Sequence, residues 1–287
     1  MLSYRHGFHA GNFADVFKHC LLVYLLVKLK QNKPFAFIDP FAAAGTYFIE
    51  DKFMQKNKEY LNGIIKVLNA NISDQIVNQY VDLIKKVNSE KNKHSINIYP
   101  GSCLLSSLVL DREDKIYLSE LHNNEFEILQ KNFANDSRII VEKKDAYSTL
   151  NATISSYKGS RLVLIDPSYE VKDEYEKVTK LIKHNTSQFS DVCYMVWYPV
   201  LDAEKTNAFI HNMLSLKIKN TTHIKIELQN SFLRMQGTGF FIINAPSEMK
   251  HDVTNSLAVL LETLKDQNYP AQIQYDVFLK NYFQVAT

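Results

Sequence analysis

Short apolar runs alternate with helical patterns along this 287-residue chain, and this alternation limits the possible folds more than any other feature of the sequence. The strand-like runs cover residues 35–38, 96–99, 115–118, 139–141, 162–165, 194–198, 222–227 and 239–243. Helical spacing of apolar residues predicts helices over 15–30, 102–110, 125–134, 173–183 and 204–216. Strands that alternate with helices predict an α/β fold with a largely parallel sheet and helices on both faces.

The two ends of the chain refine this expectation. Asp15 is a candidate N-cap for the first helix. Near the other end, Gly237, Thr238 and Gly239 come directly before an apolar run. We interpret them as the turn of an antiparallel hairpin that closes the sheet.

The distance between two strand ends predicts an insertion. In a dinucleotide-type fold the acidic residue that holds the ribose follows the first strand by ~20 residues. Here Asp39 closes the first strand, and Glu120 closes the next strand that ends in a carboxylate, about 80 positions later. Helical spacing from Tyr60 to about Lys86 fills much of the difference. We therefore predict a sheet domain formed by 1–47 and 94–287, with a small helical subdomain inserted at 48–93.

Composition narrows the classes of protein. Hydrophobic residues make up 46% and charged residues 22%, which fits a packed core and excludes a disordered chain. A net charge of +2 creates no global electrostatic field that would attract a nucleic acid. A surface that binds nucleic acid must therefore be a local basic patch. Cys20, Cys103 and Cys193 lack metal-binding spacing, which favours a reduced cytoplasm and no metal site. The most apolar stretch, 21–29, is much shorter than the ~20 residues of a membrane span.

Asp166, Pro167, Ser168 and Tyr169 directly follow the apolar run 162–165. Pro167 ends the strand, so the run places a carboxylate and an aromatic ring at a carboxyl end, where open α/β sheets bind ligands. An exocyclic amine such as adenine N6 is a weak nucleophile because its lone pair is delocalised into the ring. A carboxylate and a backbone carbonyl that accept its two hydrogens raise its electron density, and an aromatic face can stack on the base. Taken alone, the same four residues also fit a plain turn.

Three other strand ends carry carboxylates in chain order. Asp39 closes the first strand, Glu120 closes the second, and Asp145 follows the third after a short turn. In S-adenosylmethionine enzymes these positions approach the methionine moiety, the ribose hydroxyls and the adenine. Each residue alone also fits a helix N-cap or a turn. Their order, with Asp166 on the fourth strand, favours a cofactor site.

The amino terminus is dense in aromatic, basic and imidazole groups. Tyr4, Arg5, His6 and His9 precede the first helix, which carries Lys18. Such groups can stack on a base and contact phosphates. A start-of-domain segment with surface histidines is the alternative. Metal binding is not favoured because no carboxylate or cysteine lies at ligand spacing.

These residues together resemble the bacterial 23S ribosomal RNA adenine-N6 methyltransferase J family, which is also labelled as acting in the use of external DNA. The resemblance covers essentially the whole chain and is carried by residues 2–6, 8–12, 14–16, 18–19, 99–102, 120–122, 166–167, 169–170, 197–199 and 239–246. It implies a Rossmann-like S-adenosylmethionine-dependent methyltransferase sheet with an antiparallel closing strand and a helical insertion. It also implies S-adenosyl-L-methionine as cofactor and an adenine of 23S ribosomal RNA, protein-free or in early assembly, as substrate.

The resemblance assigns roles by position. The cofactor would contact His19, Asp39, Phe41, Gly45, Ser102, Glu120, Asp145, Ala146 and Asp166. Asp166, Pro167 and Tyr169 would be catalytic, and Tyr4, His6 and Lys18 would contact the substrate. Metal is not expected.

Three positions depart from the family pattern, two in the first loop and one in the turn after the fourth strand. The family's first loop reads Asp-x-His-Ala-Gly-Ala-Gly, whereas this chain has Phe41 in place of the histidine and Ala43 in place of the middle glycine. Ser168 replaces a proline of the catalytic turn. The altered loop keeps open a non-catalytic nucleic-acid-binding relative that acts in the use of external DNA. A DNA adenine methyltransferase is a second alternative because the same Asp-Pro-x-Tyr chemistry serves DNA and RNA, although the sequence contains no separate basic target-recognition domain.

Overall fold

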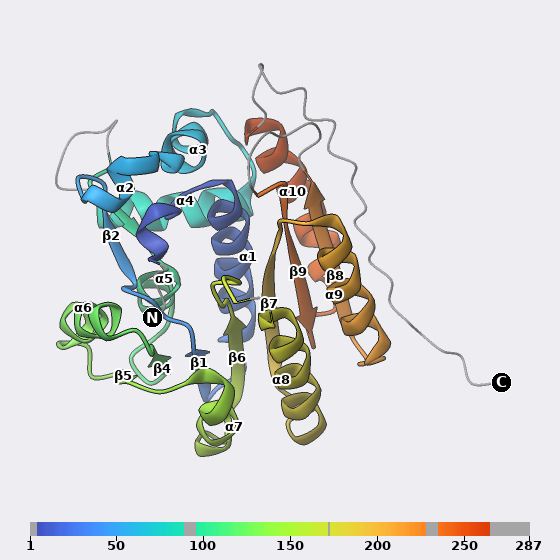
Figure 1. Cartoon of the computed structure of the whole chain (residues 1–287). Coiled ribbons are helices and arrows are strands. Elements are labelled where there is room, and N and C mark those ends of the chain that lie inside the picture. The colour runs from blue at the N-terminus through green and yellow to red at the C-terminus, as the bar shows by residue number, and fades with distance from the viewer. Residues whose placement is uncertain (1–4, 89–95, 172, 228–234, 265–287) are drawn as a thin grey trace.

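A computed structural model describes residues 5–88, 96–171, 173–227 and 235–264. Within them the main sheet has seven strands in the order β5-β4-β1-β6-β7-β9-β8 (Figure 1). The strands are β1 Phe35–Asp39, β4 Lys115–Ser119, β5 Ile139–Glu142, β6 Ser160–Ile165, β7 Cys193–Val200, β8 Thr221–Glu227 and β9 Gly237–Ile243. The first five are parallel, and β9 runs antiparallel to both β7 and β8. The predicted α/β fold with an antiparallel closing strand is confirmed.

Helices cover both faces of the sheet. They are α1 Phe13–Leu29, α5 Ser102–Val109, α6 Asn123–Phe133, α7 Ala146–Ser156, α8 Glu174–Gln188, α9 Ala203–Ser215 and α10 Met249–Leu264. Strand order runs from β1 outward to β5 and then from β6 in the opposite direction. Because parallel crossovers are right-handed, this reversal places α5 and α8 on opposite faces. The reversal lies between β1 and β6, where such sheets bind ligands.

Along the sequence, a helical block lies between β1 and the other strands of the main sheet. Its elements are α2 Lys52–Asn57, the 3-10 helix η2 Glu59–Asn62, α3 Ile64–Asn69 and α4 Gln75–Val87. The short strands β2 (Thr46–Phe48) and β3 (Ile98–Pro100) pair antiparallel at its two ends. The helical pattern from Tyr60 to Lys86 is thus three shorter elements. The subdomain boundaries at 48 and 93 stay a prediction, and residue 93 lies outside the described residues.

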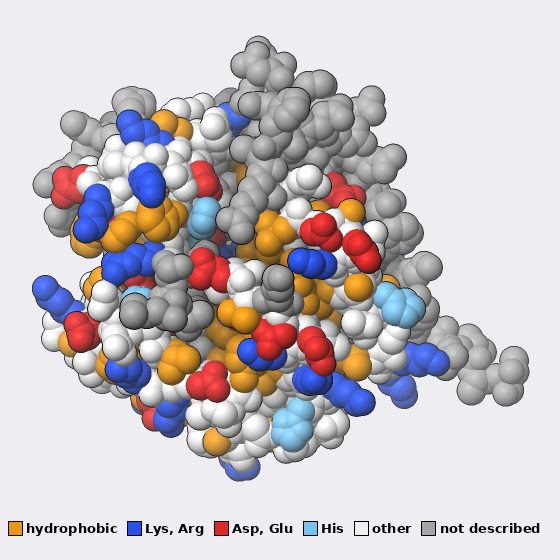
Figure 2. Space-filling model, in the orientation of Figure 1, with side chains coloured by type: hydrophobic (Ala, Val, Ile, Leu, Met, Phe, Trp, Pro, Cys, Tyr) orange, Lys and Arg blue, Asp and Glu red, His pale blue; other side chains and the backbone are white. Residues whose placement is uncertain are grey.

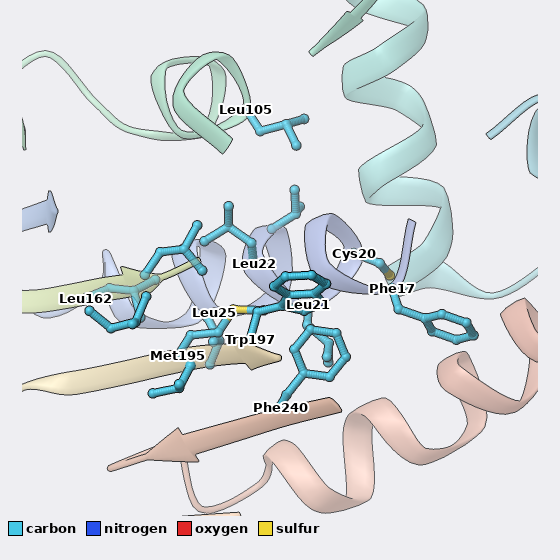
Figure 3. Packing of buried hydrophobic residues seen from close by; sticks show 14 of the residues in the cluster. Phe17, Cys20, Leu21, Leu22, Leu25, Leu105, Leu162, Met195, Trp197 and Phe240 are labelled. Atoms are coloured by element: carbon cyan, nitrogen blue, oxygen red, sulfur yellow. The ribbon is translucent and has the colours of Figure 1, made fainter. Parts of the chain in front are cut away.

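The core is built around α1. Every residue from Ala14 to Leu26 is buried, because α1 packs on β6 and β7 and also contacts α4, α5 and α10. Figure 3 shows Leu21, Leu22 and Leu25 of this helix among side chains from several other elements. Those neighbours are Leu105 of α5, Leu162 of β6, Met195 and Trp197 of β7, and Phe240 of β9.

Two local predictions are wrong. The N-cap of α1 is Asn12, whose Oδ1 accepts a hydrogen bond from the Asp15 amide at 3.0 Å, so Asp15 is not the cap. Gly237, Thr238 and Gly239 do not form a turn but begin β9. A Cβ on Gly239 would lie 2.1 Å from the Tyr198 ring, so this glycine permits close packing across the sheet.

Candidate active site

The predicted strand ends meet at one cavity. It has a volume of about 130 Å³, opens to solvent, and lies at the carboxyl ends of β1, β4 and β6. The sequence-predicted residues among those lining it are His6, Phe41, Glu120, Asp145, Ala146, Asp166 and Pro167. Residues from five separate parts of the chain therefore share one site.

Asp39 lies behind the cavity wall. Its Oδ2 accepts a hydrogen bond from the Ser102 hydroxyl at 2.6 Å, and its Oδ1 accepts one from the Phe41 amide at 3.1 Å. Burial raises the pKa of Asp39 to about 7, although the hydrogen bond from Ser102 opposes this rise. Asp39 and Ser102 thus anchor the first loop.

Glu120 fixes the same loop from the other side. Its Oε2 accepts a hydrogen bond from the Ala43 amide at 2.9 Å, and its Oε1 accepts one from the His122 amide at 2.6 Å. Each carboxylate oxygen keeps a second lone pair that can accept a hydroxyl group. Ala43 has φ +47°, a left-handed conformation that favours glycine. The departure at position 43 therefore strains the loop.

Asp145 serves as the N-cap of α7, where its Oδ1 accepts a hydrogen bond from the Tyr147 amide at 3.3 Å. The Tyr147 ring meets the Phe41 ring edge-to-face, with 5.5 Å between ring centres. These two rings form an apolar part of the cavity wall. The capping role predicted as an alternative for Asp145 is confirmed, and the residue also lines the cavity.

A buried ion-pair network supports Asp166. The Lys18 ammonium lies 2.6 Å from Asp166 Oδ2 and 2.7 Å from Asp15 Oδ1. Asp15 Oδ2 lies 2.9 Å from His6 Nε2, and the Lys18 ammonium stands 5.6 Å from the centre of the Trp197 ring. Burial lowers the pKa of Lys18, but the two carboxylates outweigh it, so the net shift is upward. The pKa of Asp15 is held well below its usual range because His6 and Lys18 outweigh its burial. Lys18 thus stays charged and fixes the Asp166 carboxylate.

Besides Asp39 and Tyr169, four described site residues that the sequence predicted do not line the cavity. His19 is buried, its Nδ1 lies 2.7 Å from the Tyr99 hydroxyl, and burial lowers its pKa to about 3. Gly45 has φ +71° in the turn before β2, where a Cβ would meet the Phe133 ring at 2.7 Å. Ser102 and Lys18 reach the site only through Asp39 and Asp166. Tyr4 lies outside the described residues.

Tyr169 also points away from the cavity. Its hydroxyl donates to the Trp197 carbonyl at 2.7 Å, and its ring centre lies 4.6 Å from that of Tyr175. The side chain is 7% exposed, and its backbone has φ +54°. A strained residue of this kind persists where neighbours hold it, and it is typical of functional loops. Stacking of this ring on a base requires a neighbouring ring to uncover one of its faces.

Sequence reasoning missed several residues of the cavity wall. These are His122, Glu125, Lys144, Tyr147 and Glu174. Glu174 is buried near the catalytic turn, and burial raises its pKa. Two of these residues could have been found from neighbouring signals, since Tyr147 follows Asp145 by two positions and Glu174 opens the helix after the catalytic turn.

A second hollow lies elsewhere on the described part of the chain. An open hollow of about 880 Å³ is lined by Asp111, Arg112, Asp136 and Arg138 among others, and the Arg138 guanidinium pairs with the Asp136 carboxylate there. In the described part of the chain, no group of three or more His, Cys, Asp and Glu side chains could hold a metal ion. Among the described helices, none is both long and apolar enough to span a membrane.

The sheet order and the site define a Rossmann-like methyltransferase of the S-adenosylmethionine-dependent class. A family profile described as "Ribosomal RNA large subunit methyltransferase D, RlmJ" matches residues 32–277. The chain belongs to this family.

Individual relatives agree with the family match. The chain is 34% identical over 260 residues to ribosomal RNA large subunit methyltransferase J of Escherichia coli strain K12, across 90% of this chain and 92% of the relative. It is 33% identical over 267 residues to the protein of that name from Haemophilus influenzae, across 92% and 94%. The crystal structure of protein LPL1258 from Legionella pneumophila superposes with a TM-score of 0.83 at 32% identity, across 93% and 98% of the two chains. The fold, including its helical block, is therefore shared over nearly the whole length.

Proposed function

We propose that this protein transfers a methyl group from S-adenosyl-L-methionine to N6 of an adenine in 23S ribosomal RNA. The observation that carries the proposal is the Asp166 carboxylate, which faces the cavity while the buried Lys18 ammonium holds it at 2.6 Å. The Pro167 carbonyl follows it in the same turn, so two acceptors stand beside a nucleotide-type site.

The donor set of the cavity fits the cofactor. Glu120 has lone pairs that would accept the ribose hydroxyls, and Asp145 and Ala146, which line the cavity, would contact the adenine. The loop from Asp39 to Gly45 with Ser102 would hold the methionine end. The bound cofactor supplies an electrophilic methyl group. Its site has a volume of about 130 Å³, whereas small-molecule sites usually measure ~300–1,000 Å³. Binding of the cofactor would therefore require the cavity to widen, and Phe41 is one of the bulky side chains in its wall.

Asp166 and the Pro167 carbonyl would accept the two N6 hydrogens of the adenine. This pairing directs the nitrogen lone pair at the methyl group and stabilises the positive charge that develops on N6. An ionised carboxylate is sufficient, so Asp166 need not remove a proton before transfer. Lys18 acts as a positioning residue because it fixes the Asp166 oxygen. Tyr169 would stack on the base after one of its ring faces is uncovered.

The adenine must leave its helical stack to reach this turn. His6, which lines the cavity, would contact the base and its phosphate, and the resemblance to the family assigns Tyr4 to the same role. The Lys18 ammonium would act on the substrate only through Asp166, which it holds at 2.6 Å. A base that has to be extruded is most accessible in RNA that is protein-free or in early assembly. This RNA substrate places the protein in the cytoplasm.

The proposal is tested with tritiated cofactor and protein-free 23S RNA, with matched DNA as a second substrate. Wild-type protein should place label in RNA as N6-methyladenine. Asp166→Ala should abolish transfer with little change in cofactor affinity, and Asp166→Asn should retain a trace. The control is Asp173→Asn, which changes an exposed carboxylate at the start of α8. Label only in DNA, or bound cofactor without any transfer, would contradict the proposal.

A further inference from the structure

A cluster of cations and aromatic rings lies beside the cavity but outside it. The Arg5 guanidinium carbon lies 4.6 Å from the centre of the Phe53 ring, and the Lys52 ammonium lies 5.1 Å from the same centre. The Lys56 ammonium lies 5.2 Å from the centre of the Phe8 ring. The two rings meet edge-to-face with 5.0 Å between their centres. We name these five residues the α2 patch.

The α2 patch joins two segments that are far apart in sequence. Phe8 ends the 3-10 helix η1 (His6–Phe8), whereas the other ring and both lysines belong to α2. A Cβ on Gly7 would lie 3.3 Å from Phe53 Cβ, so the two segments pack closely. Cations held over ring faces are restricted in orientation, and they lose less entropy when they bind an anion.

The lysines of the patch carry charge that no carboxylate neutralises within the described residues. Lys52 and Lys56 are exposed, and the ion pairs within 4.0 Å in that part of the chain do not include them. Arg5 does approach Glu125, at 3.9 Å. In Figure 2, Lys and Arg side chains surround apolar side chains at the upper left, where α2 lies in Figure 1. This is a local basic patch on a chain whose net charge is only +2.

The α2 patch continues into the mouth of the cavity. Arg5 directly precedes His6, which lines the cavity. Its partner Glu125 lines the cavity as well. A chain of phosphates that crosses the patch therefore passes directly beside the cavity that holds Asp166.

We propose that the α2 patch binds the phosphodiester backbone of the RNA strand next to the target adenine. This inference rests on the proposed function for the identity of the polyanion. Lys and Arg side chains bind phosphates without reading sequence, and they determine where along a strand an enzyme sits. The patch thus gives the helical block a role in substrate binding, because α2 supplies two of its three cations.

The test compares Lys52→Gln/Lys56→Gln with a matched control, Lys205→Gln/Lys219→Gln. The control removes two exposed lysines, one in α9 and one in the loop between α9 and β8, and α9 lies across the molecule from α2 in Figure 1. The affinity for a labelled 20-nucleotide single-stranded RNA is measured by fluorescence anisotropy over a range of salt concentrations. The patch variant should bind about tenfold more weakly, and the slope of log K against log salt should fall by about 1.4, since each phosphate contact on single strands contributes ~0.7. Cofactor affinity is measured in parallel by calorimetry and should change less than twofold.

The result separates this inference from the proposed function. If the patch variant, the control and the wild type have the same RNA affinity and the same salt slope, the proposal that the α2 patch binds RNA is overturned. This holds whatever the outcome of the methyl-transfer assay. An equal loss of affinity in the control would also overturn it, because the effect would then be one of net charge. A loss confined to the patch variant supports the inference. It does so even if wild-type protein transfers no methyl group to 23S RNA, a result that contradicts only the proposed function.

Discussion

The residues at positions 41 and 43 show how single side chains shape the proposed cofactor site. Ala43 takes a left-handed backbone conformation with φ +47°, and Phe41 lines a cavity of only about 130 Å³. The family pattern has glycine and histidine at these positions. The structure therefore gives a physical reason for each departure to matter, strain at one position and crowding at the other.

Substituting these two residues should separate the effects. Ala43→Gly should raise the free energy of unfolding by about 1 kcal/mol at most, because a left-handed alanine costs ~1–2 kcal/mol and the added flexibility of glycine offsets part of it. Phe41→His combined with Ala43→Gly should tighten cofactor binding, as measured by calorimetry. Ala10→Gly, a change at a buried alanine outside the loop, is the control for a general glycine effect. Unchanged or weaker cofactor affinity would show that Phe41 does not restrict the site.

His223 gives a pH dependence with a definite sign. Burial, with a smaller effect of Lys225, lowers its pKa from 6.5 to about 4, and the Tyr198 hydroxyl lies 2.8 Å from its Nε2. As pH falls below 6.5, His223 takes up a proton in the unfolded chain but stays neutral in the folded protein. The free energy of unfolding therefore falls between pH 6.5 and about 4. The slope is at most about 1.4 kcal/mol per pH unit.

Substitution of His223 by glutamine isolates this contribution. The glutamine oxygen can still accept the Tyr198 hydroxyl, but the side chain no longer titrates. The loss of unfolding free energy between pH 7 and pH 5 should be about 1–2 kcal/mol smaller in His223→Gln than in wild type. Titration of His19 and Asp39 contributes equally to the pH dependence of both proteins, so it cancels in this comparison. His211→Gln, which changes an exposed histidine, is the control. Identical pH profiles in urea denaturation would show that His223 is not buried in its neutral form.

At the scale of elements, the start of α1 joins the helical block to the sheet. Asn12 caps the helix and donates from Nδ2 to Glu59 at 3.0 Å. Asn12→Ala should lower the free energy of unfolding by about 1–2 kcal/mol, because the cap bond and the contact with Glu59 are both lost. Asn12→Ser keeps a capping oxygen and should recover most of the loss, as measured by urea denaturation. An equal loss in both variants would show that the contact with Glu59, not the cap, stabilises this junction.

Strands and site residues differed in how far sequence could predict them. The strand 162–165 was predictable because both of its faces are buried and its apolar run is unbroken. The helix α7 was not predicted because its serine and threonine residues give little apolar periodicity, and β2 has only three residues. Carboxylates at strand ends were predictable from their position after apolar runs. The position of Glu125 in the cavity wall and the burial of the Tyr169 ring depend on tertiary packing, which leaves no local signal in the sequence.

At the scale of the whole molecule, the cofactor should stabilise the fold. At a hundredfold excess over Kd a ligand adds ~2.7 kcal/mol, which thermal unfolding detects as a shift of several degrees. Glu120→Ala should weaken cofactor binding by about 1–3 kcal/mol, since charge-assisted hydrogen bonds to the ribose are lost. Its cofactor stabilisation, measured against its own cofactor-free state at the same concentration, should fall from ~2.7 to about 0.3–1.7 kcal/mol, and the thermal shift should fall in proportion. Glu113→Ala, an exposed residue, is the control. A full shift in Glu120→Ala would show that the ribose binds elsewhere.

The burial of α1 from Ala14 to Leu26 has a consequence for motion. Amide protons exchange with deuterated solvent only when their segment opens, and a helix packed on all sides opens only when much of the protein does. The backbone of α1 should thus be among the slowest-exchanging parts of the chain. Lys18 lies on that backbone, so the contact between its ammonium and Asp166 should persist through local openings of the outer helices, and hydrogen exchange should be slower in α1 than in α2.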